Sequence, residues 1–325
     1  MPRAVVCREL GPPERLRLES FASAPVAAGQ VRVAVHAAGI NFPDILMAAG
    51  EYQLKPELPF TPGVEAAGEV IEVADDVAGV AVGDRVIARM RHGGYADEAV
   101  VAPAQLTPLP SNFDYAEGAT FLSAHGTAHH ALVDRGQVKR NEVLLVHGAG
   151  GGVGLAAVEI GKMLGATVIA AASSEEKLAV AKARGADHLV LYAREPFRDA
   201  IKRLTDGRGA DVVFDPVGGE IFENSLRCIA WGARVLVIGF TGGIGLARTN
   251  LLLIKGASVL GVRAGEAVRR SPAIGEVRIK SLLEWAEAGK IRPHISHRLP
   301  LEDYAQAMRL LIDRKAIGRV ALTMG

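Results

Sequence analysis

A run of glycines between a short apolar segment and a helical pattern is the part of the sequence best suited to bind a reactive small molecule. Residues 143–146 are apolar and partly β-branched, which predicts a strand buried on both faces. Gly151, Gly152 and Gly154 then crowd the turn, and a helix that starts near Gly152 directs free N–H groups and its positive dipole end over the turn. Because these groups favour an anion and glycine lets the backbone approach it, the turn is predicted to bind the pyrophosphate of a dinucleotide.

The residues around these glycines support a dinucleotide site. A second apolar run, 167–172, follows the helix, so strand, turn, helix and strand fall within about 30 residues, as a βαβ unit requires. Gly151 and Gly154 match the second and third glycines of the dinucleotide fingerprint, whereas Ala149 takes the place of the first. Contacts to the nucleotide are expected from Ala149, Gly151, Gly152 and Val153. The alternative is that the glycines only allow the helix to pack closely on the sheet.

The end of the second strand indicates which dinucleotide binds. An NAD site places Asp or Glu there to hold the ribose 2′-hydroxyl, but this sequence has Ser173 and Ser174. Small hydroxyl side chains leave room for a 2′-phosphate, and Lys177, one helical turn later, supplies a positive charge for it. The site is therefore predicted to bind NADPH. In the alternative interpretation Ser173 caps a helix that begins near Glu175, Lys177 is a solvated surface residue, and the carboxylate of Glu175 or Glu176 turns toward the ribose.

The composition excludes several functional classes. The 325 residues suffice for two domains, and 49% of them are hydrophobic, so both domains can bury a core. Lysine and arginine number 37 against 36 Asp and Glu, which leaves no charge excess for nucleic acid or an anionic membrane. Two cysteines, Cys7 and Cys228, can form neither a disulfide framework nor a four-cysteine zinc site. Without a secretory signal or an apolar run of about 18 residues, we expect a soluble cytoplasmic protein with a small-molecule partner.

The elements that position the glycine turn divide the chain into two parts. Residues 1–120 carry short β-type runs separated by glycine and proline, whereas from residue 121 apolar runs alternate with helical patterns. The runs predicted to be strands of a parallel sheet are 143–146, 167–172, 188–191, 212–214, 234–238 and 258–262. This pattern predicts an α/β protein with a Rossmann-type doubly wound parallel sheet in residues 121–264, inserted into a mostly β catalytic domain.

The C-terminal segment is expected to return to the first domain. After a loop at 263–272 the sequence predicts helices at 274–288 and 301–312, a short strand near 297–299 and a last strand at 318–323. Neither helix separates two strands of the parallel sheet. The catalytic domain is therefore expected to be discontinuous and to comprise residues 1–120 plus 265–325.

Several ordered motifs together resemble one superfamily. They lie at residues 39–44, 59–68, 82–86, 93–98, 148–154, 211–219 and 318–322. In these motifs the whole chain resembles the medium-chain dehydrogenases/reductases and, among them, the zinc-independent NADPH:quinone oxidoreductases. The resemblance implies a GroES-like catalytic domain beside the nucleotide domain.

The departures from zinc-dependent members of this superfamily concern the metal ligands. Zinc alcohol dehydrogenases have a cysteine in the stretch corresponding to 39–44 and a His-Glu pair in that corresponding to 63–65, where this chain has Asn41 and Val64. An amide and an isopropyl group cannot replace thiolate and imidazole, so no metal site is expected. The adjacent His129 and His130 point about 100° apart on a helix and are poorly placed to chelate one ion.

Without a Lewis acid, the chemistry suits a conjugated acceptor that takes hydride unaided. The resemblance implies NADPH-dependent reduction of quinones, with reduction of enones or enoyl thioesters as the alternative and non-catalytic NADPH binding as a third reading. Arg263, Arg269 and Arg270, expected in the loop after the last sheet strand, could hold a phosphorylated carrier or could simply be solvated. The resemblance also implies a homodimer formed through the edge strand 258–262.

The resemblance assigns roles to individual residues. Asn41 would lie beside the nicotinamide and bond the ribose or a substrate oxygen, unless its side chain only caps the turn at 41–44. Tyr52 would orient a substrate carbonyl or simply pack. Tyr192 would help to hold the 2′-phosphate alongside Lys177, and Arg319, expected to be an exposed terminal residue, is a weaker candidate for the same charge. Further contacts to the cofactor are expected from Thr127, Val217, Gly239 and Phe240.

Overall fold

The chain forms two compact units in a computed structural model that describes residues 1–23 and 25–325. Unit 1 comprises residues 1–123 and 292–325, and unit 2 comprises residues 124–291. The first unit is therefore discontinuous, but the chain returns to it at residue 292 and not at 265 as expected from the sequence.

The physical reason for this difference is the packing of two helices, α9 (Ala264–Arg270) and α10 (Pro272–Glu287). The buried Arg278 on α10 approaches His130 Nδ1 with its Nη2 at 3.1 Å, and the Trp285 ring lies 5.5 Å from that of His129. The prediction of a loop at 263–272 is also wrong, because α9 occupies most of this segment. Arg269 and Arg270 lie on this helix, and both pair with Glu266.

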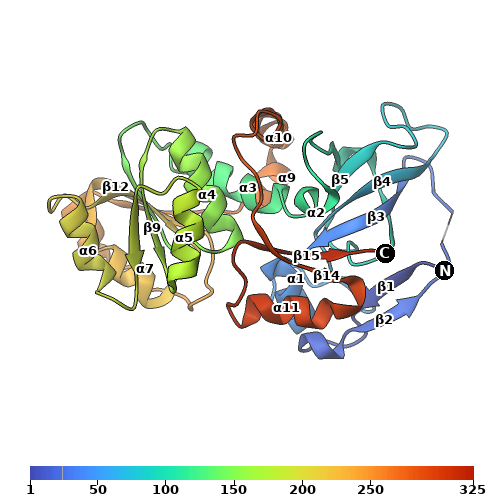
Figure 1. Cartoon of the computed structure of the whole chain (residues 1–325), viewed down its shortest axis with the longest axis horizontal. Helices are drawn as coiled ribbons and strands as arrows, with labels where there is room; N and C mark the ends of the chain where they lie inside the picture. The colour runs from blue at the N-terminus through green and yellow to red at the C-terminus, as the bar shows by residue number, and fades with distance from the viewer. Residues whose placement is uncertain (24) are drawn as a thin grey trace. The chain divides into compact units, whose positions relative to one another are not determined.

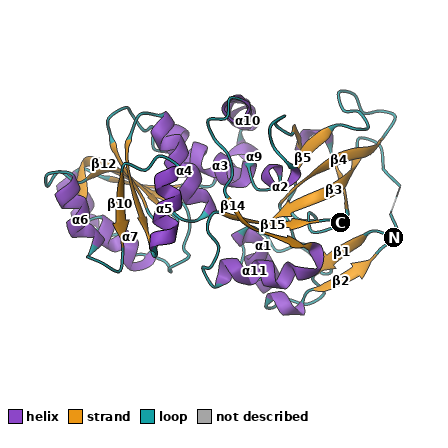
Figure 2. Cartoon of the chain, viewed as in Figure 1, coloured by secondary structure: helices purple, strands orange, loops and turns teal. Residues whose placement is uncertain are grey.

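Unit 1 is built on a largely antiparallel sheet whose strands come from both ends of the chain (Figures 1 and 2). The strand order is β14-β15-β3-β4-β5-β7, and β6 also pairs with β3. The strands are β3 (Val31–Gly39), β4 (Glu65–Val73), β5 (Arg85–Arg89), β6 (Glu98–Val101), β7 (Leu106–Pro108), β14 (Ile295–Pro300) and β15 (Arg319–Thr323). Because Ala321 pairs with Gly39, the last strand lies next to β3, beside the segment that contains Asn41.

Short helices and a separate hairpin complete unit 1. The hairpin joins β1 (Arg3–Val6) and β2 (Arg17–Ser20) in antiparallel register. The helices are α1 (Phe42–Ala49), α2 (Tyr115–Gly118) and α11 (Tyr304–Ile312), with 3-10 turns at Pro13–Arg15, Pro103–Gln105 and Leu301–Asp303. Apolar side chains of α1 and α11 pack with those of β3 and β15 in a core that includes Ile40, Met47 and Val320.

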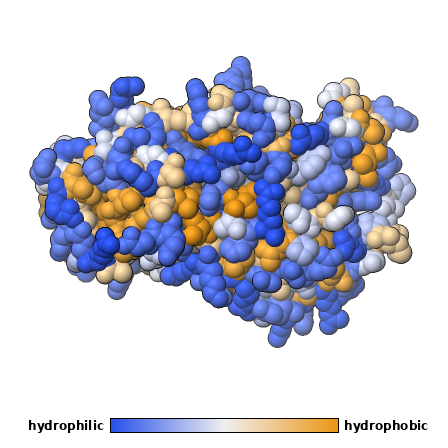
Figure 3. Space-filling model, in the orientation of Figure 1, coloured by the Kyte–Doolittle hydropathy of each residue, from blue (hydrophilic) through white to orange (hydrophobic). Residues whose placement is uncertain are grey.

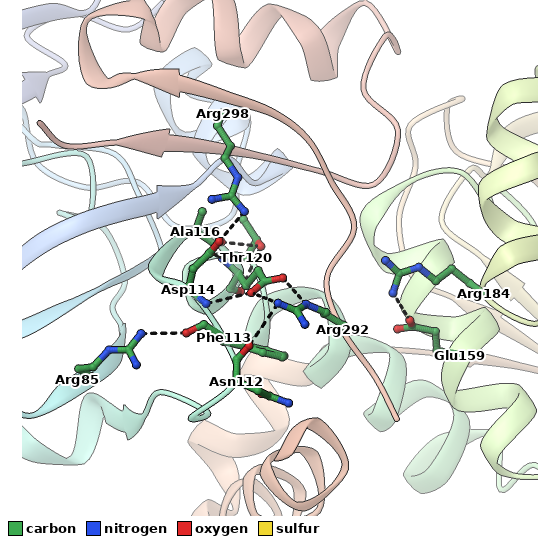
Figure 4. Close-up of polar contacts among 11 residues, drawn as sticks. Arg85, Asn112, Phe113, Asp114, Ala116, Thr120, Glu159, Arg184, Arg292 and Arg298 are labelled. Carbon is green, nitrogen blue, oxygen red and sulfur yellow. Dashed lines mark hydrogen bonds and ion pairs between the residues drawn. The ribbon is translucent and has the colours of Figure 1, made fainter. Parts of the chain in front are cut away.

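Ion pairs attach the returning segment to α2 (Figure 4). Arg292 donates to both carboxylate oxygens of Glu117, with 2.8 Å from Nη2 to Oε2, and Arg298 Nη2 lies 2.7 Å from Asp114 Oδ2. Asp114 is also the N-cap of α2, since its carboxylate accepts the N–H of Glu117. These contacts fix residues 292–298 against the first part of the unit.

Unit 2 is a six-stranded parallel sheet with helices on both faces (Figures 1 and 2). The strand order is β10-β9-β8-β11-β12-β13, so the direction of winding reverses between β8 and β11. The strands are β8 (Val143–Val146), β9 (Thr167–Ala172), β10 (His188–Leu191), β11 (Ala210–Asp215), β12 (Ile229–Val237) and β13 (Ser258–Gly261). This architecture confirms the predicted α/β class with a doubly wound sheet.

The remaining helices of unit 2 mostly follow strands of the sheet. They are α4 (Gly152–Met163), α5 (Glu175–Ala183), α6 (Phe197–Leu204), α7 (Gly219–Ser225) and α8 (Thr249–Lys255). α3 (Leu122–His129) leads from unit 1 into unit 2 and continues as a π-helix, His130–Arg135. None of the helices in the described part of the chain has the length and hydropathy that a bilayer crossing requires. On the face drawn in Figure 3, apolar side chains are interspersed with hydrophilic ones.

Candidate functional site

The glycine turn after β8 brings the backbone of two segments into close contact. Gly148 has a φ of 56°, in the left-handed region that favours glycine, and its carbonyl accepts the N–H of Gly151 at 2.9 Å. Gly154, in the first turn of α4, lies so near this carbonyl that an added Cβ would be 2.3 Å from the Gly148 oxygen. Only a residue without a side chain therefore fits at position 154.

The start of α4 has the chemistry of an anion site. Gly151 is its N-cap residue and offers no side chain to the free N–H groups of the first turn. α4 runs for 12 residues, and its positive dipole end faces the turn. The turn lies at the carboxyl end of β8, beside the point where the sheet reverses its winding, which is where open α/β sheets bind ligands.

Lys177 lies directly beside this turn. An added Cβ at Gly150 would be 2.5 Å from the Lys177 Cβ, so the aliphatic part of the lysine passes over the glycine. Lys177 Nζ donates to Ser173 Oγ at 3.4 Å. The structure therefore brings Ser173 and Lys177 together next to the predicted pyrophosphate turn.

The contacts of Ser174 and the two glutamates correct the alternative interpretation of this segment. Ser174, and not Ser173, caps α5, because its hydroxyl accepts the N–H of Lys177. Glu175 pairs with Arg194 at 2.6 Å. A hydrogen bond from the Ser174 side chain lowers the pKa of Glu176. Both carboxylates thus have partners of their own, and Ser173 is left to bond the lysine.

Tyr192, expected at the 2′-phosphate, has its hydroxyl against the glycine turn. The hydroxyl lies 2.9 Å from His147 Nδ1 and accepts the N–H of Gly148 at 3.3 Å. His147 Nε2 in turn lies 2.8 Å from Ser225 Oγ. His147 and Ser225 were not among the residues predicted from the sequence, although a histidine that directly follows the buried strand β8 was a usable signal.

The loops after β11 and β12 lie side by side, as expected. Val217 O accepts the N–H of Gly242 at 2.7 Å, and an added Cβ at Gly239 would be 3.3 Å from Pro216 O. An added Cβ at Gly148 would be 3.4 Å from Val217 Cγ2, so the glycine turn and the β11 loop are neighbours. Phe240 is 54% exposed. Thr127 occupies a half-buried position in α3.

Asn41 in unit 1 is held at both ends of its amide. Arg319 Nη2 donates to Asn41 Oδ1 at 2.8 Å, and Asn41 Nδ2 donates to the Gly39 carbonyl at 3.1 Å. Asn41 is the N-cap residue of α1, but its side chain makes no capping hydrogen bond. The Asp44 carboxylate accepts the Asn41 N–H at 2.9 Å. The amide keeps one N–H hydrogen, so Asn41 can act toward a ligand as a donor.

Arg319 is buried, contrary to the expectation of an exposed terminal arginine. It is 8% exposed and belongs to a cluster of polar side chains in unit 1. Its Nη2 lies 4.0 Å from Glu65 Oε2, and Glu65 Oε1 accepts the N–H groups of Leu122 and Ser123 at 2.6 and 3.1 Å. Burial lowers the pKa of Arg319 and raises that of Glu65, because both charged forms lose solvation.

Asp44 completes this cluster. Its carboxylate accepts from the Tyr95 hydroxyl at 2.8 Å and from the Gly63 N–H at 3.2 Å, and burial raises its pKa to about 7. Asp44, Glu65 and Tyr95 were not predicted from the sequence to form a group. Each is a polar residue within one of the three motifs at 39–44, 59–68 and 93–98, which was the available signal.

Tyr52 packs against the core of unit 1. Its side chain is half-buried and contacts the cluster of buried residues that contains Phe60 and Leu301. Its backbone N–H donates to Leu46 O at 3.2 Å, just beyond the end of α1. Of the two interpretations of Tyr52, packing is the one for which the structure gives contacts.

Several polar side chains that could attract a metal ion are committed to other partners. His125 Nε2 lies 3.0 Å from Glu159 Oε2, whose other oxygen pairs with Arg184 (Figure 4). His130 Nδ1 lies 2.7 Å from Asp134. At the position of the zinc-ligand cysteine, Asn41 presents its oxygen to a guanidinium, whose charge repels a cation. Within residues 1–23 and 25–325, no three His, Cys, Asp or Glu side chains form a group suited to a metal.

Comparisons with known proteins agree with this architecture. Residues 27–111 match the alcohol dehydrogenase GroES-like domain, and residues 152–278 match the zinc-binding dehydrogenase family. The chain is 38% identical to the quinone oxidoreductase-like protein 2 homolog of Nematostella vectensis over 324 residues, which cover 98% of this chain and 88% of that protein.

Two solved structures align over almost the entire chain. The quinone oxidoreductase of Pseudomonas syringae pv. tomato is 30% identical, with a TM-score of 0.91 over 99% of this chain and 100% of that one. A mycobacterial protein complexed with NADPH is 28% identical, with a TM-score of 0.90 over 99% of each chain. The chain therefore belongs to the quinone oxidoreductase family of the medium-chain dehydrogenases/reductases.

Proposed function

We infer that this protein is an NADPH-dependent oxidoreductase that reduces quinones without a metal ion. The observation that carries the proposal is the pair formed by Ser173 and Lys177 beside the glycine turn. A lysine ammonium and a small hydroxyl side chain are suited to a phosphate, whereas an NAD site uses a carboxylate at this point. The mycobacterial relative complexed with NADPH supports the same assignment.

The residues of unit 2 fit the group that they would hold. A Cβ at Gly154 would collide with the Gly148 carbonyl and displace the turn. The turn therefore leaves room for a pyrophosphate only because glycine occupies this position. The N–H groups at the start of α4 would bind the pyrophosphate, and Ser173 and Lys177 would bind the 2′-phosphate. The loops that contain Val217, Gly239 and Phe240 would contact the other half of the dinucleotide. Bound NADPH supplies hydride from its nicotinamide ring.

Unit 1 carries a hydrogen-bond donor that suits one class of acceptor. The fixed amide of Asn41 offers one N–H to an oxygen that gains negative charge, and the nearby guanidinium of Arg319 adds positive potential. The donor set does not suit zinc, so an alcohol or a simple ketone would lack a Lewis acid. A quinone spreads the added charge by conjugation, and a hydrogen-bond donor is sufficient for it.

A panel of acceptors tests the reaction. We expect steady-state oxidation of NADPH with benzoquinone or naphthoquinone and much slower oxidation of NADH. An enone and an enoyl thioester serve as the competing classes. Consumption of the thioester without turnover of any quinone would contradict the proposal and favour an enoyl reductase. Arg269 and Arg270 both pair with Glu266. This pairing competes with the binding of a phosphorylated carrier, which an enoyl reductase would need.

A lysine variant tests the cofactor assignment. Loss of a charge-assisted hydrogen bond costs about 1.5–3 kcal/mol, so Lys177→Ala is expected to weaken NADPH binding by at least about tenfold and to leave NADH binding unchanged. Lys182→Ala is the matched control, since Lys182 lies exposed on the same helix. Equal loss of both nucleotides in Lys177→Ala would contradict a role at the 2′-phosphate.

The proposed assembly is a homodimer formed through β13. This strand lies at an edge of the unit 2 sheet and presents unpaired backbone groups. Large apolar side chains are exposed on the neighbouring β12 and α8, with Trp231 at 77% and Leu253 at 82%. Analytical ultracentrifugation is expected to give twice the mass of the chain, and a single species of monomer mass at micromolar concentration would contradict the dimer.

A further inference from the structure

An arginine in the loop after β10 is paired with a carboxylate next to the proposed 2′-phosphate site. Arg194 follows β10 by three residues, and its Nη2 lies 2.6 Å from Oε1 of Glu175, the first residue of α5. Both side chains are exposed, Arg194 at 72% and Glu175 at 63%. The guanidinium is therefore accessible to a ligand at the carboxyl end of the sheet.

Backbone contacts hold the loop that carries Arg194 against both segments of the nucleotide site. The pairing of β10 with β9 brings Leu191 beside Ala172, and the Tyr192 N–H donates to the Ala172 carbonyl at 3.1 Å. The Arg194 N–H donates to the Leu191 carbonyl at 3.1 Å, which forms a turn at the end of β10. Tyr192 Oη lies 3.3 Å from the Gly148 nitrogen. The loop therefore lies beside the end of β9 and beside the glycine turn.

Arg194 and Lys177 approach the same part of the site from different segments of the chain. Glu175, which Arg194 contacts, is two positions from Ser173 and two from Lys177. Two residues of chain span at most about 7 Å. Exposed side chains change rotamer rapidly, so the guanidinium can turn from Glu175 toward the Ser173 hydroxyl without movement of the backbone. Lys177 Nζ already donates to this hydroxyl at 3.4 Å.

The pair of Arg194 with Glu175 is suited to exchange for a phosphate. An exposed ion pair contributes little, because water screens its charges and two long side chains have to be held in one geometry. A phosphate monoester carries about 1.5–2 negative charges at pH 7, whereas a carboxylate carries one. An arginine can donate two parallel hydrogen bonds to it. Transfer of the guanidinium from Glu175 to a phosphate is therefore favourable, and the released carboxylate is solvated.

The charges around Ser173 also favour a second cation. The single ammonium of Lys177 does not neutralise a phosphate monoester. Glu175 and Glu176, both in the first turn of α5, add negative charge next to it. Arg194 brings the number of cations at this position to two.

We propose that Arg194 is a specificity-determining residue that binds the 2′-phosphate of NADPH together with Lys177, and that Glu175 holds it beside the site until the phosphate arrives. The proposal rests on the proposed function, because it takes Ser173 and Lys177 as the 2′-phosphate site. NADH has no 2′-phosphate, so Arg194 stays paired with Glu175 when NADH binds. Arg194 and Glu175 therefore act in opposite directions on the affinity for NADPH, and neither affects the affinity for NADH.

Fluorescence titrations of the full chain with both nucleotides test this assignment. Arg194→Ala is expected to weaken NADPH binding about tenfold, through loss of charge-assisted hydrogen bonds, and to leave NADH binding unchanged. Arg194→Lys retains the charge but not the paired N–H groups and should lose about threefold. Glu175→Gln removes the competing carboxylate and is expected to strengthen NADPH binding about threefold. Unchanged NADPH affinity in Arg194→Ala, or an equal loss of both nucleotides, would overturn the proposal.

Arg208→Ala is the matched control for the loss of an exposed ion-paired arginine. Arg208 pairs with Asp211, the second residue of β11, and so lies at the amino end of the parallel sheet. Ser173 and Lys177 follow the carboxyl end of β9, at the opposite edge. The control variant is expected to bind both nucleotides as the wild type does. A selective loss of NADPH in this variant would overturn a local role for Arg194.

A spectroscopic measurement follows the guanidinium in the wild-type protein. The Nε–H resonance of Arg194, identified by its absence from the spectrum of Arg194→Lys, is expected to shift several times further with NADPH than with NADH. Equal shifts would overturn the proposal. Wild-type protein that binds NADPH no more tightly than NADH would overturn the proposed cofactor together with this proposal. Selective loss of NADPH in Lys177→Ala without any loss in Arg194→Ala would overturn this proposal alone.

Discussion

A methyl group added at Gly154 tests whether the position of the turn creates the nucleotide site. The new Cβ would lie 2.3 Å from Gly148 O and 2.8 Å from Ala149 Cα, both backbone atoms that cannot rotate away. Ordinary contact begins near 3.4 Å, so the turn has to retreat by about 1 Å in a closely packed interior. A shift of this size breaks at least one hydrogen bond between the turn and a bound phosphate, at a cost of about 2 kcal/mol. Gly154→Ala is therefore expected to weaken NADPH binding about 30-fold.

The stability of this variant reflects two opposing effects. Alanine in place of glycine within a helix stabilises by up to about 1 kcal/mol, whereas overpacking costs about 1–3 kcal/mol. A small net loss in the free energy of unfolding is expected, and urea denaturation measures it. Calorimetric titration with NADPH and NADH measures the binding.

Gly161 provides a matched control on the same helix. A Cβ there would meet Leu144 Cδ2 at 2.5 Å and Val168 Cγ2 at 3.2 Å, which are ends of side chains on the strand side of α4, far along the helix from the turn. Gly161→Ala is expected to lose comparable stability and to bind NADPH as the wild type does. Unchanged NADPH affinity in Gly154→Ala, or an equal loss in both variants, would refute the reasoning about the turn.

Three further predictions concern other parts of the molecule. Asn41→Asp keeps an oxygen for Arg319 but removes the N–H donor, so kcat for a quinone is expected to fall about 100-fold with a smaller change in the KM for NADPH; unchanged kcat would contradict the donor role. Ser174→Ala removes the N-cap of α5 and should lower the free energy of unfolding by about 1 kcal/mol in urea, whereas Ser173→Ala should retain stability and lose preference for NADPH. Burial lowers the pKa of His147 to about 3, and an unfolded histidine titrates near 6.5, so the unfolded state binds the proton first. Relative to His147→Gln, the free energy of unfolding of the wild type should therefore fall by about 1.4 kcal/mol for each pH unit below 6.5 down to 3; an equal pH dependence in the two proteins would contradict this prediction.

The parallel sheet could be predicted from the sequence because its strands are buried on both faces. The expected bounds 143–146, 167–172 and 188–191 agree with β8, β9 and β10. In such a sheet a strand is a continuous apolar run between breakers, and this pattern depends on local sequence alone. Strands that lie near the surface or contain polar residues were less well predicted: β12 begins at Ile229, earlier than the expected 234, across the exposed Trp231 and Gly232.

α9 was not predicted because its sequence has no periodic apolar face that becomes buried. None of its residues is buried, and its contacts include pairs of Glu266 with Arg269 and Arg270, three and four positions later. Such pairs are favourable on a helix surface, but the same residues in sequence also suit a solvated loop. α9 and α10 both belong to unit 2. The chain therefore returns to unit 1 at residue 292 and not at the expected residue 265.

The environment of Arg319 could not be predicted, because its partners are distant in sequence. Asn41 lies 278 positions away, and only the pairing of β15 with β3 brings the two side chains together. Hydropathy places a terminal arginine at the surface by default. The proximity of Ser173 and Lys177 could be predicted because they are four positions apart and follow one strand.

Stability does not account for the burial of Arg319. A buried guanidinium loses solvation that its contacts recover only in part, and apolar replacements for buried ion pairs are often neutral or stabilising. Here the recovery is incomplete: Nη2 stands 4.0 Å from Glu65 Oε2, and in the described part of the chain both that oxygen and Arg319 Nε lack a hydrogen-bond partner. The guanidinium instead selects one of the two orientations of the Asn41 amide. A flipped amide would direct Nδ2 at the positive charge and its oxygen at the Gly39 carbonyl, and both contacts would be repulsive. The remaining N–H of Asn41 is thereby fixed as a donor before any ligand arrives, which is the condition under which a single hydrogen bond lowers a reaction barrier most.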